Sequence, residues 1–374
     1  MPDLFDYLKW RADVPFSADP FNEVDNMILS ELAYTCFEGM PEDDSEVTIK
    51  KAFDDFFAVH TREEMLSINS YTAKSSLLME DMISGARFEN TALFRYINEI
   101  DKENDKQIAA VTYLLDDGTA FVAFRGTDST LVGWKEDFDL SYLSRTDGQK
   151  RAVEYLNGVG TYLDMPLRVG GHSKGGNFAV YASSFCEKSV RDRIINVYSN
   201  DGPGFRKEIT ESEGYNEILP RVISIVPDTS VIGMLLSNTF EHKVIKSTAS
   251  GIYQHDGFTW QVSRNRFETS ETTEAGRFIK NVLGMWVEKM TDDDRRTLTS
   301  SLFTLFEATG KNSFTDMGEQ KWKTFEAIVS SLPSLPKESR KDLMRIAGLL
   351  LKSGGRSAAE MLPSRNKKAE PKSE

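Results

Sequence analysis

Cysteine is scarce in this chain. Its 374 residues include two cysteines, Cys36 and Cys186, which lie far apart, and no group of cysteines and histidines has the spacing of a metal site. We therefore expect neither a disulfide framework nor a structural zinc, and we predict no metal or organic cofactor. This cysteine usage is typical of proteins in the reducing cytosol.

Basic charge is also low. Lysines and arginines total 45 against 58 aspartates and glutamates, which gives a net charge of −13. A nucleic-acid-binding surface needs clustered cations for its phosphate contacts, and no basic stripe interrupts the acidic background. The sequence therefore predicts no nucleic-acid partner and disfavours a strongly anionic membrane surface.

Long hydrophobic runs are missing. No segment approaches the roughly 20 apolar residues that a membrane-spanning helix requires, so no transmembrane segment is expected. The first residues include Asp3, Asp6 and Asp13, where a secretory signal peptide would need a basic start and an apolar run. A cytoplasmic location is the expectation that follows.

What the chain does have is enough apolar sequence for a large core, because 40% of its residues are hydrophobic. Helical spacing predominates over 21–82, strand-like and helical segments alternate after it, and helical patterns return beyond Arg264. We predict an N-terminal helical segment packed on the core (1–90), an α/β core (91–263), a C-terminal helical region (264–363) and a disordered tail (364–374).

Alternating elements define the predicted core. The expected strands are Leu93–Ile97, Ile108–Leu115, Phe121–Phe124, Leu167–Val169, Ile194–Tyr198, Val222–Val226 and Lys243–Ile245. The expected helices between them are Gly148–Leu163 and Gly175–Cys186. Such alternation favours a mainly parallel sheet with helices on both faces. Outside the core, we expect a helix from Ser45 to about His60 and a capping-box start at Thr291, with Asp294 three residues later.

One pentapeptide within the core points to chemistry. Gly171-His172-Ser173-Lys174-Gly175 follows an expected strand and opens an expected helix. This is the context of a nucleophile elbow, in which small flanking residues allow a sharp turn that lifts the serine hydroxyl clear. The alternative is an ordinary glycine-rich turn with a capping serine. We take Ser173 as the candidate nucleophile.

A serine hydroxyl needs a base to remove its proton, and the chain has four histidines. His60 lies in the helical segment before the sheet, His172 adjoins the serine and normally projects away from it, and His242 begins a strand. His255 follows the last strand, in a loop that contains Gly257. It is therefore the expected base.

The imidazole in turn needs a carboxylate that fixes its tautomer. Asp228 follows the strand Val222–Val226 and gives the chain order serine, aspartate, histidine that α/β-hydrolases use. Asp201, after the preceding strand, ranks second, and Asp256 is weaker because adjacent side chains seldom meet in an extended loop. Asp228 could instead cap a following helix.

Acyl transfer also needs donors for the developing oxyanion. The backbone N–H of Lys174, directly after the serine, is the first expected donor. The second is expected at Thr127, where the strand Phe121–Phe124 ends in Arg125-Gly126-Thr127. Without the elbow, that segment would read as a turn at a strand end with no role.

With these residues in place, the sequence resembles the fungal-type (class 3) lipases and a related family of bacterial α/β-hydrolases. The similarity rests on four ordered motifs: Phe124–Thr127 with Trp134 and Asp137, the elbow, Arg221–Asp228, and His255–Trp260. Two positions depart from the lipase pattern. Lys174 stands where an apolar residue is usual, and Val231–Leu236 replaces a proline-rich stretch. These departures weaken the case for triglycerides as substrates.

We therefore expect an α/β-hydrolase that cleaves a small-molecule or lipid carboxylic ester through Ser173, Asp228 and His255. A thioesterase or peptidase could use the same three residues, because leaving-group preference depends on pocket shape. A third alternative is a non-catalytic interaction protein on a hydrolase scaffold, with the C-terminal helices as its binding surface.

Overall fold

The computed structural model describes residues 1–37, 39–40, 45–68, 71–101, 106–127, 140, 142–143, 145–230, 232–233, 236, 239–271, 291–297 and 300. Several expectations lie outside these residues: Trp134 and Asp137, half of the stretch 231–236, most of the C-terminal helical region, and the tail. Within them, the expected capping box is confirmed, because Thr291 N donates to Asp294 Oδ2 at 3.0 Å and Asp294 N donates to Thr291 Oγ1 at 3.1 Å.

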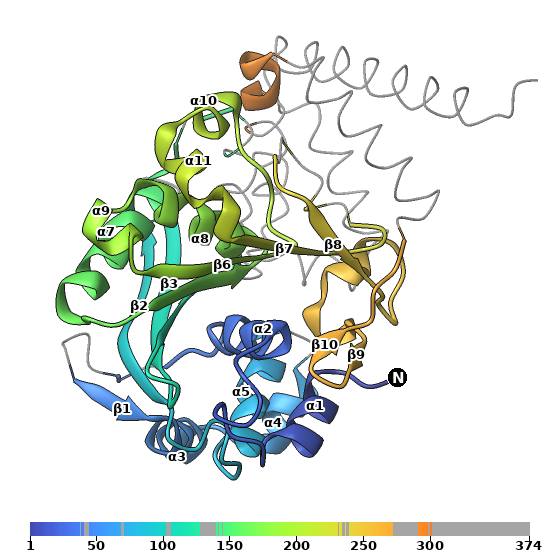
Figure 1. Ribbon diagram of the computed structural model, residues 1–374. Coiled ribbons are helices and arrows are strands. Elements are labelled where there is room, and N and C mark those ends of the chain that lie inside the picture. Colours follow the sequence, from blue (N-terminus) through green and yellow to red (C-terminus); the bar gives the residue numbers. More distant parts are fainter. Residues whose placement is uncertain are drawn as a thin grey trace, which may run out of the picture.

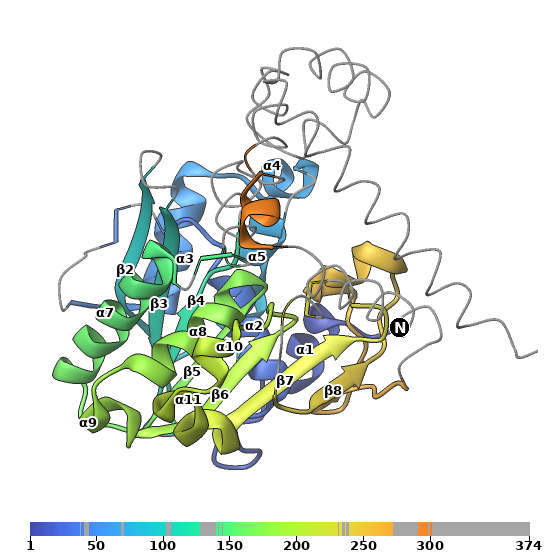
Figure 2. The same cartoon turned by 90° about the horizontal axis from the view of Figure 1, so that it is seen from above.

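An eight-stranded sheet forms the centre of the described structure, in the order β1 to β8 (Figure 1). The strands are β1 (Glu46–Thr48), β2 (Ala92–Asp101), β3 (Lys106–Leu114), β4 (Ala120–Phe124), β5 (Leu167–His172), β6 (Ile194–Asn200), β7 (Val222–Pro227) and β8 (His242–Ile245). Strands β1 to β4 pair antiparallel, whereas β4 to β8 are parallel. Figure 2 shows them from above, in sheet order from β2 to β8.

Helices cover both faces of the sheet, as predicted. One face carries α7 (Asp147–Tyr162), α8 (Lys174–Phe185), α9 (Lys188–Arg191), α10 (Lys207–Thr210) and α11 (Glu213–Ile218). The other carries α1 (Leu4–Arg11), α2 (Glu23–Leu32), α3 (Ile49–Val59), α4 (Arg62–Ser67) and α5 (Tyr71–Met82). Figure 1 shows α2 and α8 on opposite sides of β6. Two buried apolar clusters, one on each side, hold these layers together.

The N-terminal segment contributes a strand as well as helices. The expected helix from Ser45 to His60 begins at Ile49, because Glu46–Thr48 pairs antiparallel with β2 and forms the edge strand β1. Thr48 then caps α3 by accepting a hydrogen bond from Lys51 N. A short polar stretch at a sheet edge carries no strand periodicity, so the sequence pattern extended the helix too far.

A buried ion pair holds the N-terminal helices in place. Arg87, which is 1% exposed, donates through Nε to Asp25 Oδ1 at 2.7 Å and through Nη2 to Asp25 Oδ2. Tyr7 Oη donates to Asp25 Oδ1 at 2.9 Å, and the backbone N–H of Asn22 donates to Asp25 Oδ2 at 2.9 Å. Because a buried charge is tolerated when it is paired and fully hydrogen-bonded, this network fixes α1 and α2 to the chain before β2.

After β8, the chain forms short turns and a small hairpin. These are the 3₁₀ helices η2 (Gly251–His255) and η3 (Gly257–Thr259), followed by the two-stranded pair β9 (Val262–Ser263) and β10 (Arg266–Phe267). A further 3₁₀ turn, η1 (Leu219–Arg221), precedes β7. No helix in the described part of the chain is long and apolar enough to cross a membrane.

Candidate active site

Ser173 occupies a strained turn between β5 and α8. Its backbone has φ 58° and ψ −130°, a conformation that costs free energy for a residue with a Cβ. The surrounding structure enforces it: Ser173 N donates to Asn200 O at 2.9 Å, and Gly176 N donates to Ser173 O at 2.9 Å. Together with the parallel half of the sheet, this strand-turn-helix confirms the predicted α/β-hydrolase fold.

The two glycines of the pentapeptide are required by close backbone packing. A Cβ at Gly175 would lie 2.0 Å from the carbonyl oxygen of Phe124, and one at Gly171 would lie 2.4 Å from the same oxygen. The turn is therefore pressed against the end of β4. This contact explains why the sequence has glycine at both positions, and it brings the segment after Phe124 next to the serine.

We expect Gly175→Ala to destabilise the protein by about 1–3 kcal/mol, because the methyl group must displace backbone rather than a flexible side chain. Gly158→Ala is the matched control: it lies inside α7, and a Cβ there would meet mainly the guanidinium of Arg95, which can move. Urea unfolding of the two variants measures the difference. Equal stabilities would contradict the packing explanation.

His255 lies beside the strained turn, at the end of η2. Its ring centroid is 4.6 Å from that of His172, the residue before Ser173. Its Nδ1 lies 2.7 Å from Asp201 Oδ2, in a pair whose side chains are 15% and 1% exposed. An imidazole held in this way has a fixed ring orientation, and its Nε2 is the nitrogen that remains for a reacting group.

Asp201 follows β6, and its surroundings hold its carboxylate in position for this contact. It has a positive φ of 50°, is fully buried, and donates its N–H to Ile225 O at 2.7 Å. Its Oδ1 accepts from the hydroxyl of Ser230 and from Gly233 N at 3.2 Å. One carboxylate oxygen is thus held by the loop after β7, while the other meets the histidine.

The prediction that Asp228 contacts His255 is wrong, because His255 pairs with Asp201 instead. Asp228 Oδ1 instead accepts from Gln254 Nε2 at 2.8 Å and from Thr229 Oγ1 at 2.9 Å. The reason is strand order: β6 is hydrogen-bonded to β5, which ends directly before Ser173, whereas β7 is one strand further away. Asp228 therefore supports the loop that holds the histidine, and Asp201, ranked second from the sequence, makes the histidine contact.

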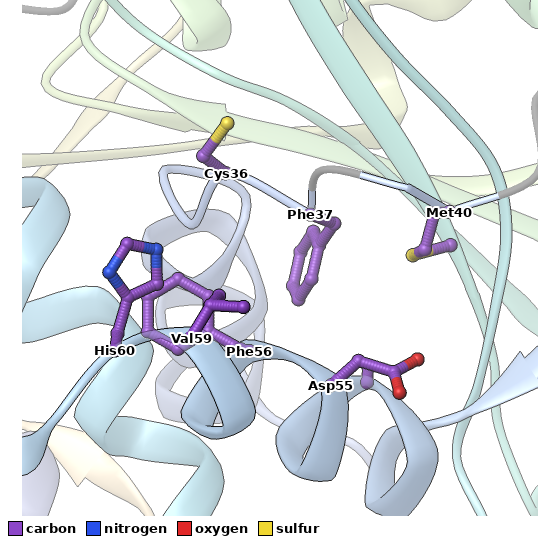
Figure 3. A pocket seen from close by; sticks show the side chains of 8 residues that line it. Cys36, Phe37, Met40, Asp55, Phe56, Val59 and His60 are labelled. Atoms are coloured by element: carbon purple, nitrogen blue, oxygen red, sulfur yellow. The ribbon is translucent and has the colours of Figure 1, made fainter.

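The other titratable groups considered from the sequence lie elsewhere. Asp256 forms an ion pair with Lys74 at 3.3 Å, and His242 Nδ1 lies 2.8 Å from Ser224 Oγ near the start of β8. His60 ends α3 and lines a small pocket of about 40 Å³ with Cys36 and Asp55, among other residues (Figure 3).

Of the two expected oxyanion donors, Lys174 directly follows the serine, and Thr127 follows a glycine that packs against the turn. A Cβ on Gly126 would lie 2.6 Å from His172 O and 3.0 Å from Ser173 Cβ, which places the residue before Thr127 against the turn. Lys174 is the first residue of α8, at the positive end of the helix dipole. Its side chain, however, is buried and donates to Gln107 O at 3.1 Å, so this ammonium group is not exposed at the surface of the site.

Helix α2 forms a polar floor under the site that the sequence did not reveal. Asn26 and Asn200 exchange amide hydrogen bonds of 2.9 and 3.1 Å, and Asn200 Nδ2 also donates to Ser30 Oγ at 3.3 Å. Glu31 and Tyr34 contact the ring of His172. The available signal was the wide apolar face of 23–32, formed by Val24, Met27, Ile28, Leu29 and Leu32, which indicates a helix buried over more than a narrow stripe.

Among known proteins, a family model described as Mbeg1-like matches residues 82–304, more than half of the chain. The chain is similar to the solved structure of M37 lipase, with 12% identity, 58% of this chain and 70% of that chain covered, and a TM-score of 0.38. It is also similar to the native Rhizomucor miehei lipase propeptide complex, with 13% identity, 63% of this chain and 79% of that chain covered, and a TM-score of 0.38. A third similar structure is the lipase from Rhizopus microsporus var. chinensis, with 13% identity, 62% of this chain and 94% of that chain covered, and a TM-score of 0.35. No curated protein sequence matches the chain.

Proposed function

The chain belongs to the Mbeg1-like family, and we propose that it is a serine hydrolase that cleaves carboxylic esters through Ser173, His255 and Asp201. One observation carries the proposal. Beside a serine in a strained strand-to-helix turn, the Nδ1 of His255 lies 2.7 Å from the buried carboxylate of Asp201. This pairing is what a serine needs nearby to become a nucleophile.

In the first half of the reaction, Ser173 Oγ attacks the ester carbonyl carbon while its proton passes to His255 Nε2. Asp201 keeps the Nδ1 proton in place and stabilises the imidazolium that forms. The N–H of Lys174 and the segment ending at Thr127 stabilise the negative charge on the carbonyl oxygen. The imidazolium then protonates the departing alkoxide, which leaves as the alcohol.

The second half repeats these roles with water. His255 Nε2 removes a proton from a water molecule, whose oxygen attacks the acyl carbon bound to Ser173 Oγ. The tetrahedral intermediate collapses, Ser173 recovers its proton from the imidazolium, and the carboxylic acid product departs. Atoms balance with one ester and one water consumed for one acid and one alcohol released.

The test is labelling of the full-length protein with a fluorophosphonate probe. We expect the wild-type protein to be labelled. We expect Ser173→Ala to be unlabelled and its esterase activity to fall by at least about 10³-fold. Ser189→Ala, at an exposed serine on α9, is the control and keeps both. Unlabelled wild-type protein, or labelling that survives in Ser173→Ala, would refute the proposal. A panel of matched ester, thioester and amide substrates then tests the choice of ester.

A further inference from the structure

A fully buried carboxyl group lies under the proposed catalytic histidine. Glu31, near the end of α2, is 0% exposed, and neither of its carboxyl oxygens has a well-directed hydrogen bond within the described residues. Its Oε1 is 3.3 Å from Nδ1 of His172. A Cβ on Gly257, two residues after His255, would lie 2.6 Å from the same oxygen. The carboxyl group is thus enclosed between the turn at Ser173 and the loop of His255.

The ring of His172 connects this carboxyl group to the loop of His255. Its Nε2 lies 2.8 Å from the carbonyl oxygen of His255, and its Nδ1 lies 3.2 Å from Tyr34 Oη. Because a carbonyl oxygen can only accept, Nε2 must carry a proton. Burial lowers the pKa of His172 well below its usual range, so the ring is neutral and Nδ1 is an acceptor.

We propose that Glu31 and Tyr34 are positioning residues, which hold His172 in the tautomer protonated on Nε2 so that His172 anchors the backbone of His255. The anchored loop keeps the ring of His255 aligned between Asp201 and Ser173. This inference rests on the proposed function, because its purpose is to align the base. Glu31, Tyr34 and His172 are all buried, so they act on the base through packing and hydrogen bonds and not through substrate contact.

Tyr34 Oη, 3.2 Å from Nδ1, is one neutral donor to this nitrogen, and a carboxyl group that also faces Nδ1 must be neutral as well. An ionised Glu31 would place carboxylate lone pairs against the lone pair of Nδ1, whereas a protonated carboxyl has an O–H to donate. Burial, aided by the nearby charge of Asp256, raises the pKa of Glu31 well above its usual range, and Lys74 of α5 partly opposes that rise. The other titratable groups facing it are His172 and Tyr34. Burial and the facing lone pair of Nδ1 therefore both favour the protonated form of Glu31.

A raised carboxyl pKa gives stability a definite dependence on pH. The unfolded chain releases the Glu31 proton near the ordinary pKa of about 4.3, while the folded protein keeps it. Between that pH and the raised pKa, this group makes the folded state less stable as pH rises, by up to about tenfold in the unfolding equilibrium constant per pH unit. Above the raised pKa its effect levels off.

Three substitutions test the proposal. Glu31→Leu removes the carboxyl group that faces Nδ1 at similar size, and we expect kcat to fall by about tenfold or more through misalignment of the base, with KM unchanged. Glu31→Gln keeps a neutral N–H donor, so it should recover most of the lost kcat and lack the alkaline decline in activity and stability that Glu31 causes in the wild type. Leu29→Ala, which removes apolar packing from the same helix, is the control for destabilisation alone.

A spectroscopic measurement reads the tautomer directly, without substrate. In ¹⁵N-histidine-labelled wild-type protein, assigned with His172→Gln, we expect the shifts of a neutral His172 ring protonated on Nε2. We expect Glu31→Leu to perturb them and Glu31→Gln to preserve them. A His172 ring protonated on Nδ1 or on both nitrogens overturns the proposal, as does Glu31→Leu with unchanged kcat. If Glu31→Leu does not fold, the wild-type shifts and the pH profile of Glu31→Gln still decide.

The two proposals fail in different ways. If the fluorophosphonate probe does not label wild-type protein, the serine hydrolase assignment fails, whatever the state of His172. If the probe labels Ser173 but the labelling rate, kcat and His172 shifts of Glu31→Leu all match the wild type, then only the positioning proposal is overturned.

Discussion

Asp201→Asn is expected to lower kcat for ester hydrolysis by about 10³–10⁴-fold while KM stays within a few-fold. The amide keeps the size of the carboxylate but can donate to Nδ1, which favours the tautomer that cannot receive the serine proton. It also removes the negative charge that stabilises the imidazolium. Steady-state kinetics on a chromogenic ester, with circular dichroism to confirm folding, measure the effect.

Asp228→Asn is the matched comparison, because both aspartates follow neighbouring parallel strands. Asp228 contacts Gln254 rather than the histidine, so its amide variant loosens the loop without changing the tautomer of His255. We expect a loss of about tenfold at most. If Asp228→Asn were the more damaging of the two variants, the assignment of Asp201 would be wrong.

The second large effect is on stability. Arg87→Met should destabilise the protein by about 3–5 kcal/mol, because it leaves the buried carboxylate of Asp25 without its cation. The double variant Asp25→Leu/Arg87→Met removes both charges, and we expect it to recover a large part of that loss. Urea unfolding of the full-length chain gives the three free energies.

An exposed ion pair provides the control for this comparison. Lys50 and Asp54 face each other one turn apart on α3, and both side chains are more than half exposed. Lys50→Ala should change the free energy of unfolding by less than about 1 kcal/mol, since solvent screens such pairs. If Arg87→Met cost no more than Lys50→Ala, the buried pair would not be what anchors the N-terminal helices.

The sequence predicted the core well because its signals there are local. The strands around Ser173 and the helix after it are adjacent in the chain, so a short pattern specifies both the turn and the two glycines. The choice of His255 as the candidate base rests on elimination among four histidines, which also needs no knowledge of distant contacts. In these regions, local preference and the final structure agree.

The choice between Asp201 and Asp228 could not be made in the same way. Both follow a strand of the parallel half of the sheet, and the order of residues along the chain does not tell which strand lies next to the one carrying the serine. Glu31 was missed for a related reason. A glutamate near the end of a helix usually faces solvent, and only the packing of α2 under β5 buries it.

The exchange of hydrogen bonds between Asn26 and Asn200 has a consequence for how the molecule folds. These two side chains are separated by 174 positions in the chain, and Glu31 meets His172 across a similar interval. Contacts of such long sequence separation form slowly, because a large loop must close before they contribute. During synthesis, α2 emerges long before the strands that it supports. We therefore expect the contacts between α2 and the turn at Ser173 to form late in folding, after the parallel strands have assembled.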